Sequence, residues 1–295
     1  MFPLASYQPD LFENDPNWNT PKTTGSLISG HFQDLQDYHT GSIVAPSNTQ
    51  SLSFSYDGTK LFVVQRSIYC FRYTLGAPFS VSLGGSFDTR TMFTGIYSLV
   101  PSKDGLNFYI TSEAGTTGVI RYTTSTPFDL DSSVFHSFLD TSNDMTRASG
   151  IEISPDGRYL YLCEDSGYTS EVSIFLYYLE TPFDITTGVY LEKYVANTYD
   201  SNIKNLYSLK VSPNGDYLWF SYWWFDSSIS DSRHGLLRLK LNHRFRLYDV
   251  DGPDGLDPNT WIASDQALGF EYAPQGDRLL FGGNGSGLYE MTYTD

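Results

Sequence analysis

The sequence predicts an all-β protein, and three observations support this fold class. Charged residues make up only 18% of the 295 residues, whereas aromatic residues make up 16%, with 23 Tyr and 20 Phe. Tyr and Phe favour strands, and a low content of charged helix formers argues against long helices. Five segments repeat an apolar strand, a tight turn and a second apolar strand, and a second motif follows four of them.

The five repeats are predicted β-hairpins that share one turn chemistry. Each turn places Asp, Asn or Gln before a glycine, and three copies carry a proline before that pair. Proline sets φ at the first corner, Asp or Asn hydrogen-bonds its own backbone, and glycine takes the position with positive φ. The turn glycines lie 47 to 61 residues apart, which is the length of a four-stranded β-propeller blade. The hairpins occupy residues 52–64, 99–110, 151–162, 209–220 and 270–281.

A third strand and an aromatic corner follow each of the first four hairpins. The third strand ends in a short corner segment, which contains proline in the first three copies and has decayed in the fourth. We expect the aromatic side chain to pack back at this corner and a fourth, outer strand to follow it. The corner residues are Phe79, Phe128, Phe183 and Phe245.

The two ends of the chain predict how the repeats are joined. The fifth copy stops after a third strand at residues 287–293, and residues 26–32 resemble the outer-strand segment 81–87. We therefore predict a single five-bladed β-propeller over residues 24–295, closed by its N-terminal strand so that no sheet edge stays open. Residues 1–23 contain four prolines and are predicted to form a short extended N-terminal arm outside the ring.

The paired motifs resemble those of a known family. A Ser-Pro-Asp-Gly hairpin followed by Tyr-x-Leu-x-Thr-Pro-Phe-Asp-Leu/Ile is similar to the β-propeller repeats that are abundant in tailed-bacteriophage virion proteins and bacterial surface proteins. Residues 124–130 and 180–187 match the second half best, and the resemblance covers about residues 50–290. It implies a virion or cell-surface propeller used for attachment or assembly. It implies no catalytic residue, because the motif residues are architectural.

The charge balance excludes several kinds of partner. Lys and Arg number 18 against 34 Asp and Glu, which gives a net charge of −16. Nucleic acid and anionic membrane surfaces both require clustered basic residues, so neither is an expected partner. No run of about 18 apolar residues suggests membrane insertion. Cys70 and Cys163 lack zinc-site spacing, and no nucleotide-binding motif occurs, so no cofactor is expected.

The expected function is that of a non-enzymatic structural component of a bacteriophage virion, as a fibre, spike or decoration propeller. It would attach to the host surface, where a glycan is a possible ligand, or dock on neighbouring virion proteins through the arm, in several copies. The N-terminus lacks the basic and apolar regions of a secretion signal, which favours a virion assembled in the host cytoplasm. The alternatives are a carbohydrate-binding or glycoside-hydrolysing propeller and a bacterial surface interaction module.

One aromatic run is the candidate ligand site. Ligands of propellers usually bind on the face built by the loops between second and third strands and between successive blades. In the fourth copy this loop begins with aromatic residues beside an acid and a base. Such rings stack on sugars or anchor protein partners, although alternate members of the run could instead pack between blades. The predicted ligand-binding residues are Tyr222, Trp223, Trp224, Asp226 and Arg233.

Three acidic segments are weaker candidates for a metal site. Residues 140–144, 164–167 and 249–257 carry neighbouring carboxylates, and Ca²⁺ prefers oxygen ligands in flexible loops. The first two lack the alternating Asp spacing of a dedicated calcium loop. In the third, which comes closer, the acids are unevenly spaced and Pro253 interrupts them. No metal is therefore assigned.

Aligning the five hairpins places three charged residues at one position of the first strand. They are Glu152, Lys210 and Glu271, and the other two copies have Ser53 and Val100 there. First strands line the central channel of a propeller, so these side chains are predicted to cluster. The cluster is either a structural Glu–Lys–Glu network or a carboxylate pair for glycoside hydrolysis.

Overall fold

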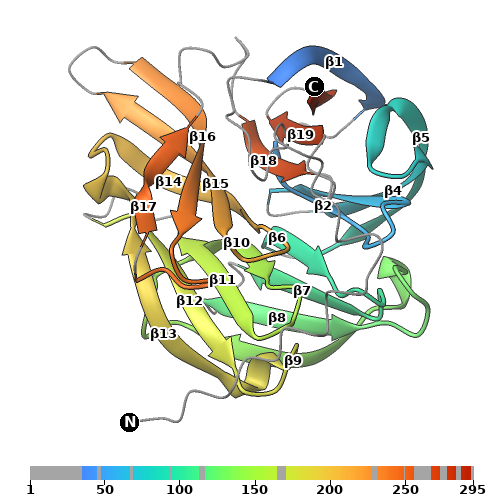
Figure 1. The fold of residues 1–295 in the computed structure, drawn as a ribbon. Helices are drawn as coiled ribbons and strands as arrows, with labels where there is room; N and C mark the ends of the chain where they lie inside the picture. Colours follow the sequence, from blue (N-terminus) through green and yellow to red (C-terminus); the bar gives the residue numbers. More distant parts are fainter. Residues whose placement is uncertain are drawn as a thin grey trace.

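The computed structural model is an all-β structure of five four-stranded antiparallel sheets (Figure 1). It describes residues 35–44, 48–66, 69–93, 95–112, 117–164, 171–226, 231–248, 250–255, 267–272, 278–283 and 287–293. Helix in these ranges is limited to three short 3₁₀ turns, η3 (Leu130–Ser132), η4 (Ile185–Thr187) and η5 (Ala196–Thr198). None of the described helical turns could cross a membrane.

Four of the sheets each use four consecutive strands, and we number them I to IV. Sheet I contains β2 (Thr49–Phe54), β3 (Lys60–Gln65), β4 (Tyr69–Ala77) and β5 (Ser80–Met92). Sheet II contains β6 (Ile96–Pro101), β7 (Asn107–Ser112), β8 (Gly118–Thr123) and β9 (Val134–Asp140). Sheet III contains β10 (Ala148–Ile153), β11 (Tyr159–Glu164), β12 (Ser173–Leu179) and β13 (Gly188–Val195). Sheet IV contains β14 (Ile203–Val211), β15 (Tyr217–Asp226), β16 (Asp231–Leu241) and β17 (Val250–Gly255).

Sheet V joins the two ends of the chain. It contains β18 (Ala267–Tyr272), β19 (Arg278–Gly283) and β20 (Gly287–Tyr293), and β1 (Leu35–Val44) pairs antiparallel with β20 as its fourth strand. The segment 26–32, which the sequence predicts as the closing strand, lies outside the described residues, as does the predicted arm at 1–23. The N-terminal strand that pairs with the last repeat is therefore the one at residues 35–44.

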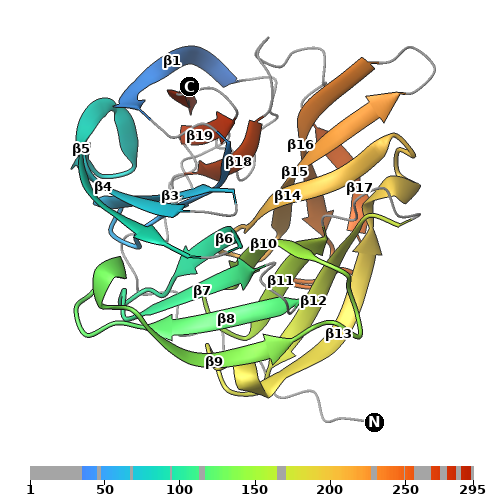
Figure 2. The same cartoon turned by 180° about the vertical axis from the view of Figure 1, so that it is seen from behind.

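The five sheets have a propeller-like arrangement, which agrees with the predicted fold class. Figures 1 and 2 show them around a common centre, with the first strand of each sheet on the inside and the fourth strand on the outside. The first strands contact one another in chain order, and β18 of sheet V contacts β2 of sheet I. Apolar clusters fill the spaces between neighbouring sheets, for example between sheets III and IV. Many of the described aromatic side chains are buried in this core.

The hairpin turns have the predicted chemistry. In sheet III the backbone N–H of Gly157 donates to the carbonyl of Ser154 at 2.8 Å. The Asp156 carboxylate accepts from the Ser154 hydroxyl at 2.5 Å and from the backbone N–H of Arg158 at 3.0 Å. Gly157 has a φ of +72°, which glycine adopts without steric cost. The same glycine-to-serine backbone bond closes the turns at Gly58, Gly105 and Gly215.

Each corner phenylalanine packs back as predicted, and the structure shows that it contacts the turn glycine of its own sheet. The backbone N–H of Phe183 donates to the carbonyl of Gly157 at 2.8 Å, and Phe183 itself has a φ of +62°. A Cβ atom added to Gly157 would lie 2.4 Å from the Phe183 ring, so this contact requires glycine. The equivalent pairs are Gly58–Phe79, Gly105–Phe128 and Gly215–Phe245.

Neighbouring sheets are joined through the carbonyl groups of these corners. The Tyr109 hydroxyl of sheet II donates to the carbonyl of Phe183 in sheet III at 2.8 Å. The Tyr161 hydroxyl of sheet III makes the equivalent bond to Phe245 of sheet IV, also at 2.8 Å. Sheet I has Phe62 in the tyrosine position, and there Arg72 Nη1 donates to the carbonyl of Phe128 at 2.6 Å instead. The carbonyl of the corner phenylalanine thus accepts a hydrogen bond from the preceding sheet in all three cases, although the donor is arginine and not tyrosine in sheet I.

Candidate functional site

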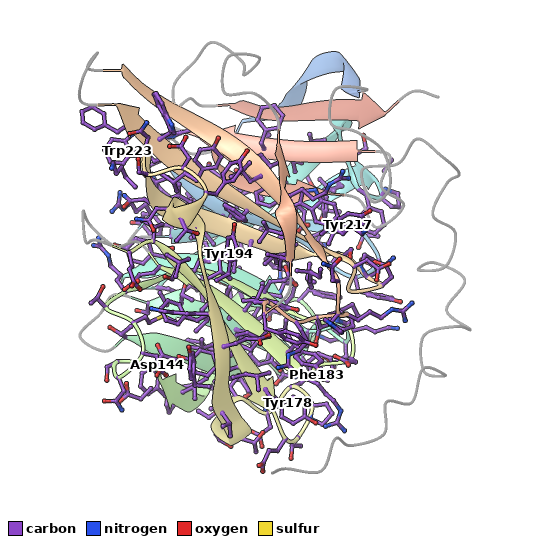
Figure 3. All side chains as sticks on the ribbon, turned by 60° about the vertical axis from the view of Figure 1, so that its left-hand side comes forward. Asp144, Tyr178, Phe183, Tyr194, Tyr217 and Trp223 are labelled. Atoms are coloured by element: carbon purple, nitrogen blue, oxygen red, sulfur yellow. The ribbon has the colours of Figure 1, made fainter. Side chains whose placement is uncertain are left out.

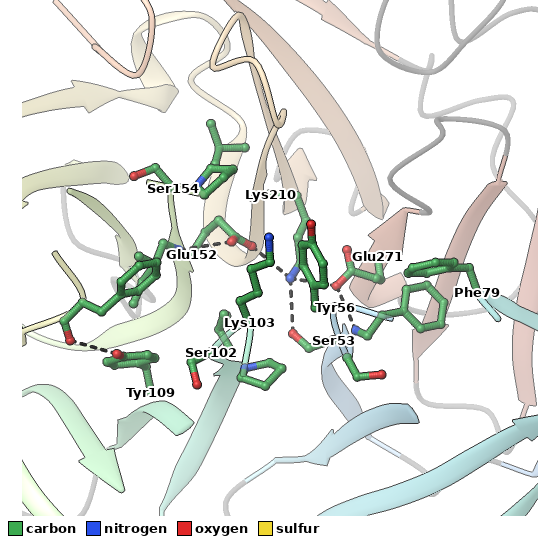
Figure 4. Close-up of a pocket in the computed structure, with 18 residues that line it drawn as sticks. Ser53, Tyr56, Phe79, Ser102, Lys103, Tyr109, Glu152, Ser154, Lys210 and Glu271 are labelled. Carbon is green, nitrogen blue, oxygen red and sulfur yellow. Dashed lines mark hydrogen bonds and ion pairs between the residues drawn. The ribbon is translucent and has the colours of Figure 1, made fainter. Parts of the chain in front are cut away.

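The three charged residues predicted for the channel lie together between the first strands. Lys210 on β14 stands between Glu152 on β10 and Glu271 on β18 (Figure 4). Its Nζ atom lies 3.0 Å from Oε2 of Glu152 and 2.9 Å from Oε2 of Glu271. It also donates to the Ser53 hydroxyl of β2 at 3.3 Å. Three carboxylate and hydroxyl oxygens therefore surround one ammonium group, and four of the five sheets contribute.

Backbone groups complete this network. The Ser53 hydroxyl donates to the carbonyl of Leu99 at 2.8 Å, which connects the network to sheet II. Glu271 accepts from the backbone N–H of Phe54 at 3.3 Å, and Glu152 accepts from the N–H of Ile153 at 3.1 Å. The arrangement is the predicted Glu–Lys–Glu network, in which charges removed from water are paired and hydrogen-bonded.

Burial controls the protonation of this cluster. Burial raises the pKa of Glu152 to about 7, and the neighbouring charge of Glu271 adds to this shift, while Lys210 opposes it. Burial alone would lower the pKa of Lys210, but the two carboxylates outweigh it and hold the pKa above its ordinary value. Lys210 thus stays charged, whereas the cluster can bind a further proton near neutral pH.

The cluster forms the floor of a pocket of about 150 Å³. The rest of the pocket lining comes from the ends of the first strands, from the hairpin-turn residues Tyr56 and Lys103, and from the corner residue Phe79. It therefore lies at the turn end of the sheets. The predicted ligand face, built by the loops between second and third strands, is at the other end.

Two pocket residues were not singled out from the sequence. Tyr56 and Lys103 occupy the turn position that is proline in the third, fourth and fifth repeats. Lys103 Nζ lies 4.1 Å from the centre of the Tyr56 ring, which is a cation–π contact between sheets I and II. Their departure from proline at a repeated position is the signal that could have identified them.

The predicted ligand-binding run lies on β15 and β16, and its members point to two faces of the sheet. Tyr222 is only 4% exposed and belongs to the core between sheets III and IV. Trp224 packs against the same core, and its indole N–H donates to Asp200 at 2.8 Å. Trp223 points the other way and stacks on Phe225, with ring centres 5.7 Å apart and planes 26° apart. Alternation along the strand therefore separates the run.

The other two predicted residues of this site are placed only by their backbone. Arg233 on β16 is paired with Trp224, and Asp226 at the end of β15 is paired with Asp231. Figure 3 shows Trp223 at the opposite end of the molecule from Phe183, which is at a turn-end corner. The run is thus far from the pocket that holds the Glu–Lys–Glu network.

The acidic segments proposed for a metal have other roles where they are described. Glu164 accepts from the backbone N–H and the hydroxyl of Thr146, both at 2.7 Å. Asp144 accepts from the Tyr177 hydroxyl at 2.8 Å. The interpretation of residues 249–257 as a loop is wrong for Val250–Gly255, which form β17 and pair with β16. Among the described residues, no three His, Cys, Asp or Glu side chains are grouped to hold a metal.

The two cysteines are buried and form no disulfide bond, as expected for small apolar core residues. Burial raises the pKa of the Cys70 thiol well above its ordinary range, with Arg72 opposing the shift. A thiol in this state is a weak nucleophile and a poor metal ligand.

Comparison with known proteins supports the fold and does not assign a family. No family model and no curated protein matches the sequence. Among solved structures, Kuenenia stuttgartiensis hydrazine synthase is 14% identical with a TM-score of 0.52, over 83% of this chain and 75% of that chain. The Myceliophteria thermophila Cps50 (Swd1) β-propeller domain is 8% identical with a TM-score of 0.47, over 88% and 100% of the chains. At these identities the likeness concerns the fold alone.

Proposed function

We propose that the five sheets are the five blades of one closed β-propeller, latched by the pairing of β1 with β20. Two observations support closure: the first strands contact in a cycle that returns from β18 to β2, and the Glu–Lys–Glu network joins first strands across the centre. The pairing of β1 with β20 covers the edge that β20 would otherwise expose. A chain that ends before β20 should therefore lose the cooperative unfolding of the whole ring.

We propose that this propeller is a non-enzymatic structural component of a bacteriophage virion. The observation that supports the proposal is that several motif residues shared with virion propeller repeats serve the fold. Gly157 and Phe183 lock a corner, Asp156 shapes a turn, and Asp184 caps η4 by accepting from Thr186. The features that make one such propeller specific for its partner must then lie outside the motifs, on its surface and in its arm.

The Glu–Lys–Glu network also supports a non-enzymatic role. Glycoside hydrolysis needs one carboxyl group to donate a proton and a second to act as base or nucleophile. Here both carboxylates lie within 3.0 Å of the same ammonium group, Lys210 Nζ, which occupies the space between them. Turnover should therefore be absent with a panel of glycoside substrates. A turnover that Glu152→Gln or Glu271→Gln abolished would contradict this proposal.

Docking in the particle is assigned to the N-terminal arm, residues 1–23. The experiment is to produce particles with this segment deleted, and with a Gly/Ser segment of equal length as a matched control. Both variants should fold with an unchanged melting temperature and fail to incorporate. Normal incorporation of either variant would overturn the docking role while leaving the fold assignment intact.

A second candidate function is the binding of a host surface glycan at the β15–β16 hairpin. The specific observation is the Trp223–Phe225 stack, a pair of rings on the face of sheet IV opposite the core that it shares with sheet III. Such a surface suits the apolar face of a sugar ring. A glycan array should show binding that Trp223→Ala removes and that Tyr248→Ala, at an exposed aromatic elsewhere, retains. Absence of binding by the wild type excludes this function.

A further inference from the structure

The pocket above the Glu–Lys–Glu network has opposite charges at its floor and at its mouth. The floor holds two carboxylates against one ammonium group, Lys210 Nζ, and so has one excess negative charge. The exposed side chain of Lys103 also lines the pocket and places its ammonium group 4.1 Å from the centre of the Tyr56 ring (Figure 4). A ligand that enters the pocket therefore meets a positive group at the mouth and a negative floor behind it.

The Glu152 carboxylate can accept more hydrogen bonds than the network uses. A carboxylate has about four acceptor positions. The described structure gives Glu152 one contact with Lys210 Nζ and one hydrogen bond from the backbone N–H of Ile153. Glu152 lines the pocket, and its side chain is 12% exposed. An N–H donor that reaches the floor can therefore bind to this carboxylate.

The floor keeps its excess negative charge although Lys103 is part of the lining. Burial is the largest cause of the raised pKa of Glu152, and the charges that act on it are those of Lys210 and Glu271. Lys103 is exposed, and solvent and salt screen its charge. The floor therefore attracts a cationic group, whereas the mouth attracts an anionic group.

The size of the pocket limits the ligand to a short molecule. A cavity of the same volume, about 150 Å³, holds benzene, so the pocket has room for about six non-hydrogen atoms. The rest of the lining includes the apolar side chains of Phe79, Val100 and Pro155. A ligand that fits this pocket has two charged ends joined by a short apolar link.

We propose that this pocket binds a small amino acid as a zwitterion, with its ammonium group on the carboxylates of the floor and its carboxylate facing Lys103. A simple cation would be repelled by Lys103 at the mouth, and a simple anion would be repelled by the carboxylates of the floor. A zwitterion pairs with both ends and adds no net charge to a chain that carries −16. This assignment does not depend on the proposed virion role.

The first test compares three small probes for binding to the full-length protein, measured by saturation-transfer NMR titrations. The probes are β-alanine, n-propylammonium and propanoate, which share a three-carbon chain and differ in their charged ends. β-Alanine should bind about tenfold more tightly than either of the other two, because only β-alanine pairs with both ends of the pocket.

The second test removes the charge at each end of the pocket. Glu152→Gln and Lys103→Met should each weaken the binding of β-alanine by about tenfold. The matched controls are Glu180→Gln and Lys240→Met, which remove the same charges at exposed positions outside the lining and should leave the affinity unchanged. The melting temperature of each variant verifies that it is folded. Because Lys103 is exposed, Lys103→Met tests the site even where Glu152→Gln does not fold.

The pH dependence of binding distinguishes a direct contact with Glu152 from a structural effect. An ammonium group at the floor favours the ionised form of Glu152, whose pKa is about 7. The affinity of the wild type for β-alanine should therefore fall by about tenfold between roughly pH 8 and pH 6, whereas that of Glu152→Gln should stay constant. This comparison separates Glu152 from the other titratable residues of the lining, which are Tyr56, Lys103, Tyr109, Lys210 and Glu271.

Three results would overturn the proposal. In the first, the wild type binds neither β-alanine nor alanine. In the second, n-propylammonium or propanoate binds as tightly as β-alanine. In the third, Glu152→Gln and Lys103→Met both keep the wild-type affinity for β-alanine.

Discussion

The ring of Phe183 occupies the space that any side chain on Gly157 would need, at 2.4 Å from an added Cβ atom. The two residues are 26 positions apart, and both have a positive φ. The close contact between them therefore depends on the backbone turn at each position. The same lock recurs in sheets I, II and IV. It explains why a hairpin glycine and a corner phenylalanine are repeated together.

This lock predicts that Gly157→Ala is strongly destabilising. An alanine at φ +72° has a conformational penalty and also collides with the Phe183 ring. Together these effects should lower the free energy of unfolding by about 2–5 kcal/mol. Gly76→Ala, at an exposed position of β4 without positive φ, is the control and should change it by less than about 1 kcal/mol. Denaturant unfolding of both variants checks this.

The contact between sheets III and IV predicts a smaller effect for Tyr161→Phe. The substitution removes the hydroxyl that donates to the carbonyl of Phe245 and leaves that acceptor without this donor. The loss should be about 1–3 kcal/mol. Tyr199→Phe, at a residue 55% exposed, should be close to neutral. Equal stabilities for the two variants would show that the bond between sheets contributes nothing.

The charge network predicts that Lys210→Met is among the most damaging single substitutions. It leaves Glu152 and Glu271 close together in a buried site without their cation. Breaking a buried ion pair in this way costs about 3–5 kcal/mol at neutral pH. The triple variant Glu152→Gln, Lys210→Met, Glu271→Gln should recover most of the loss, because no charge then remains unpaired. Thermal unfolding of the wild type and both variants distinguishes a charge effect from lost packing.

The raised pKa of Glu152 predicts a particular pH dependence of stability. The pKa is about 7 in the folded protein and 4.5 in the reference state, so the folded state binds the proton more tightly. The contribution of this group to stability is therefore complete below pH 4.5 and is lost as the pH rises to about 7. Its magnitude is on the order of 3 kcal/mol.

The measurement is the difference in unfolding free energy between the wild type and Glu152→Gln across this pH range. Taking the difference removes the contributions of surface carboxylates that titrate in the same range. Relative to the variant, the wild type should become less stable from pH 4.5 to about 7. A difference that stays constant, or that changes in the opposite direction, would contradict the protonation state assigned to Glu152.

Much of this structure follows from local chemistry and could be predicted. The Asp-Gly turns, the corner phenylalanines and the common position of Glu152, Lys210 and Glu271 depend on residues close in sequence or on equivalent repeats. Three features could not be predicted in this way. Val250–Gly255 form a strand because β16 offers them an edge, although their composition is that of a loop. The pocket formed at the turn end, and the aromatic run from Tyr222 was divided between two faces.

The sequence by itself determined the repeated hairpins, their turns and the all-β class, because each depends on backbone preferences acting over a few residues. Only the tertiary structure decided that residues 35–44 pair with β20, because this pairing joins segments from opposite ends of the chain. The tertiary structure also decided how the three charged side chains in the centre of the ring are paired. Glu152 and Glu271 become a paired network because folding places one lysine between them and removes all three from water. Burial and proximity across the centre of the ring are properties of the packed sheets.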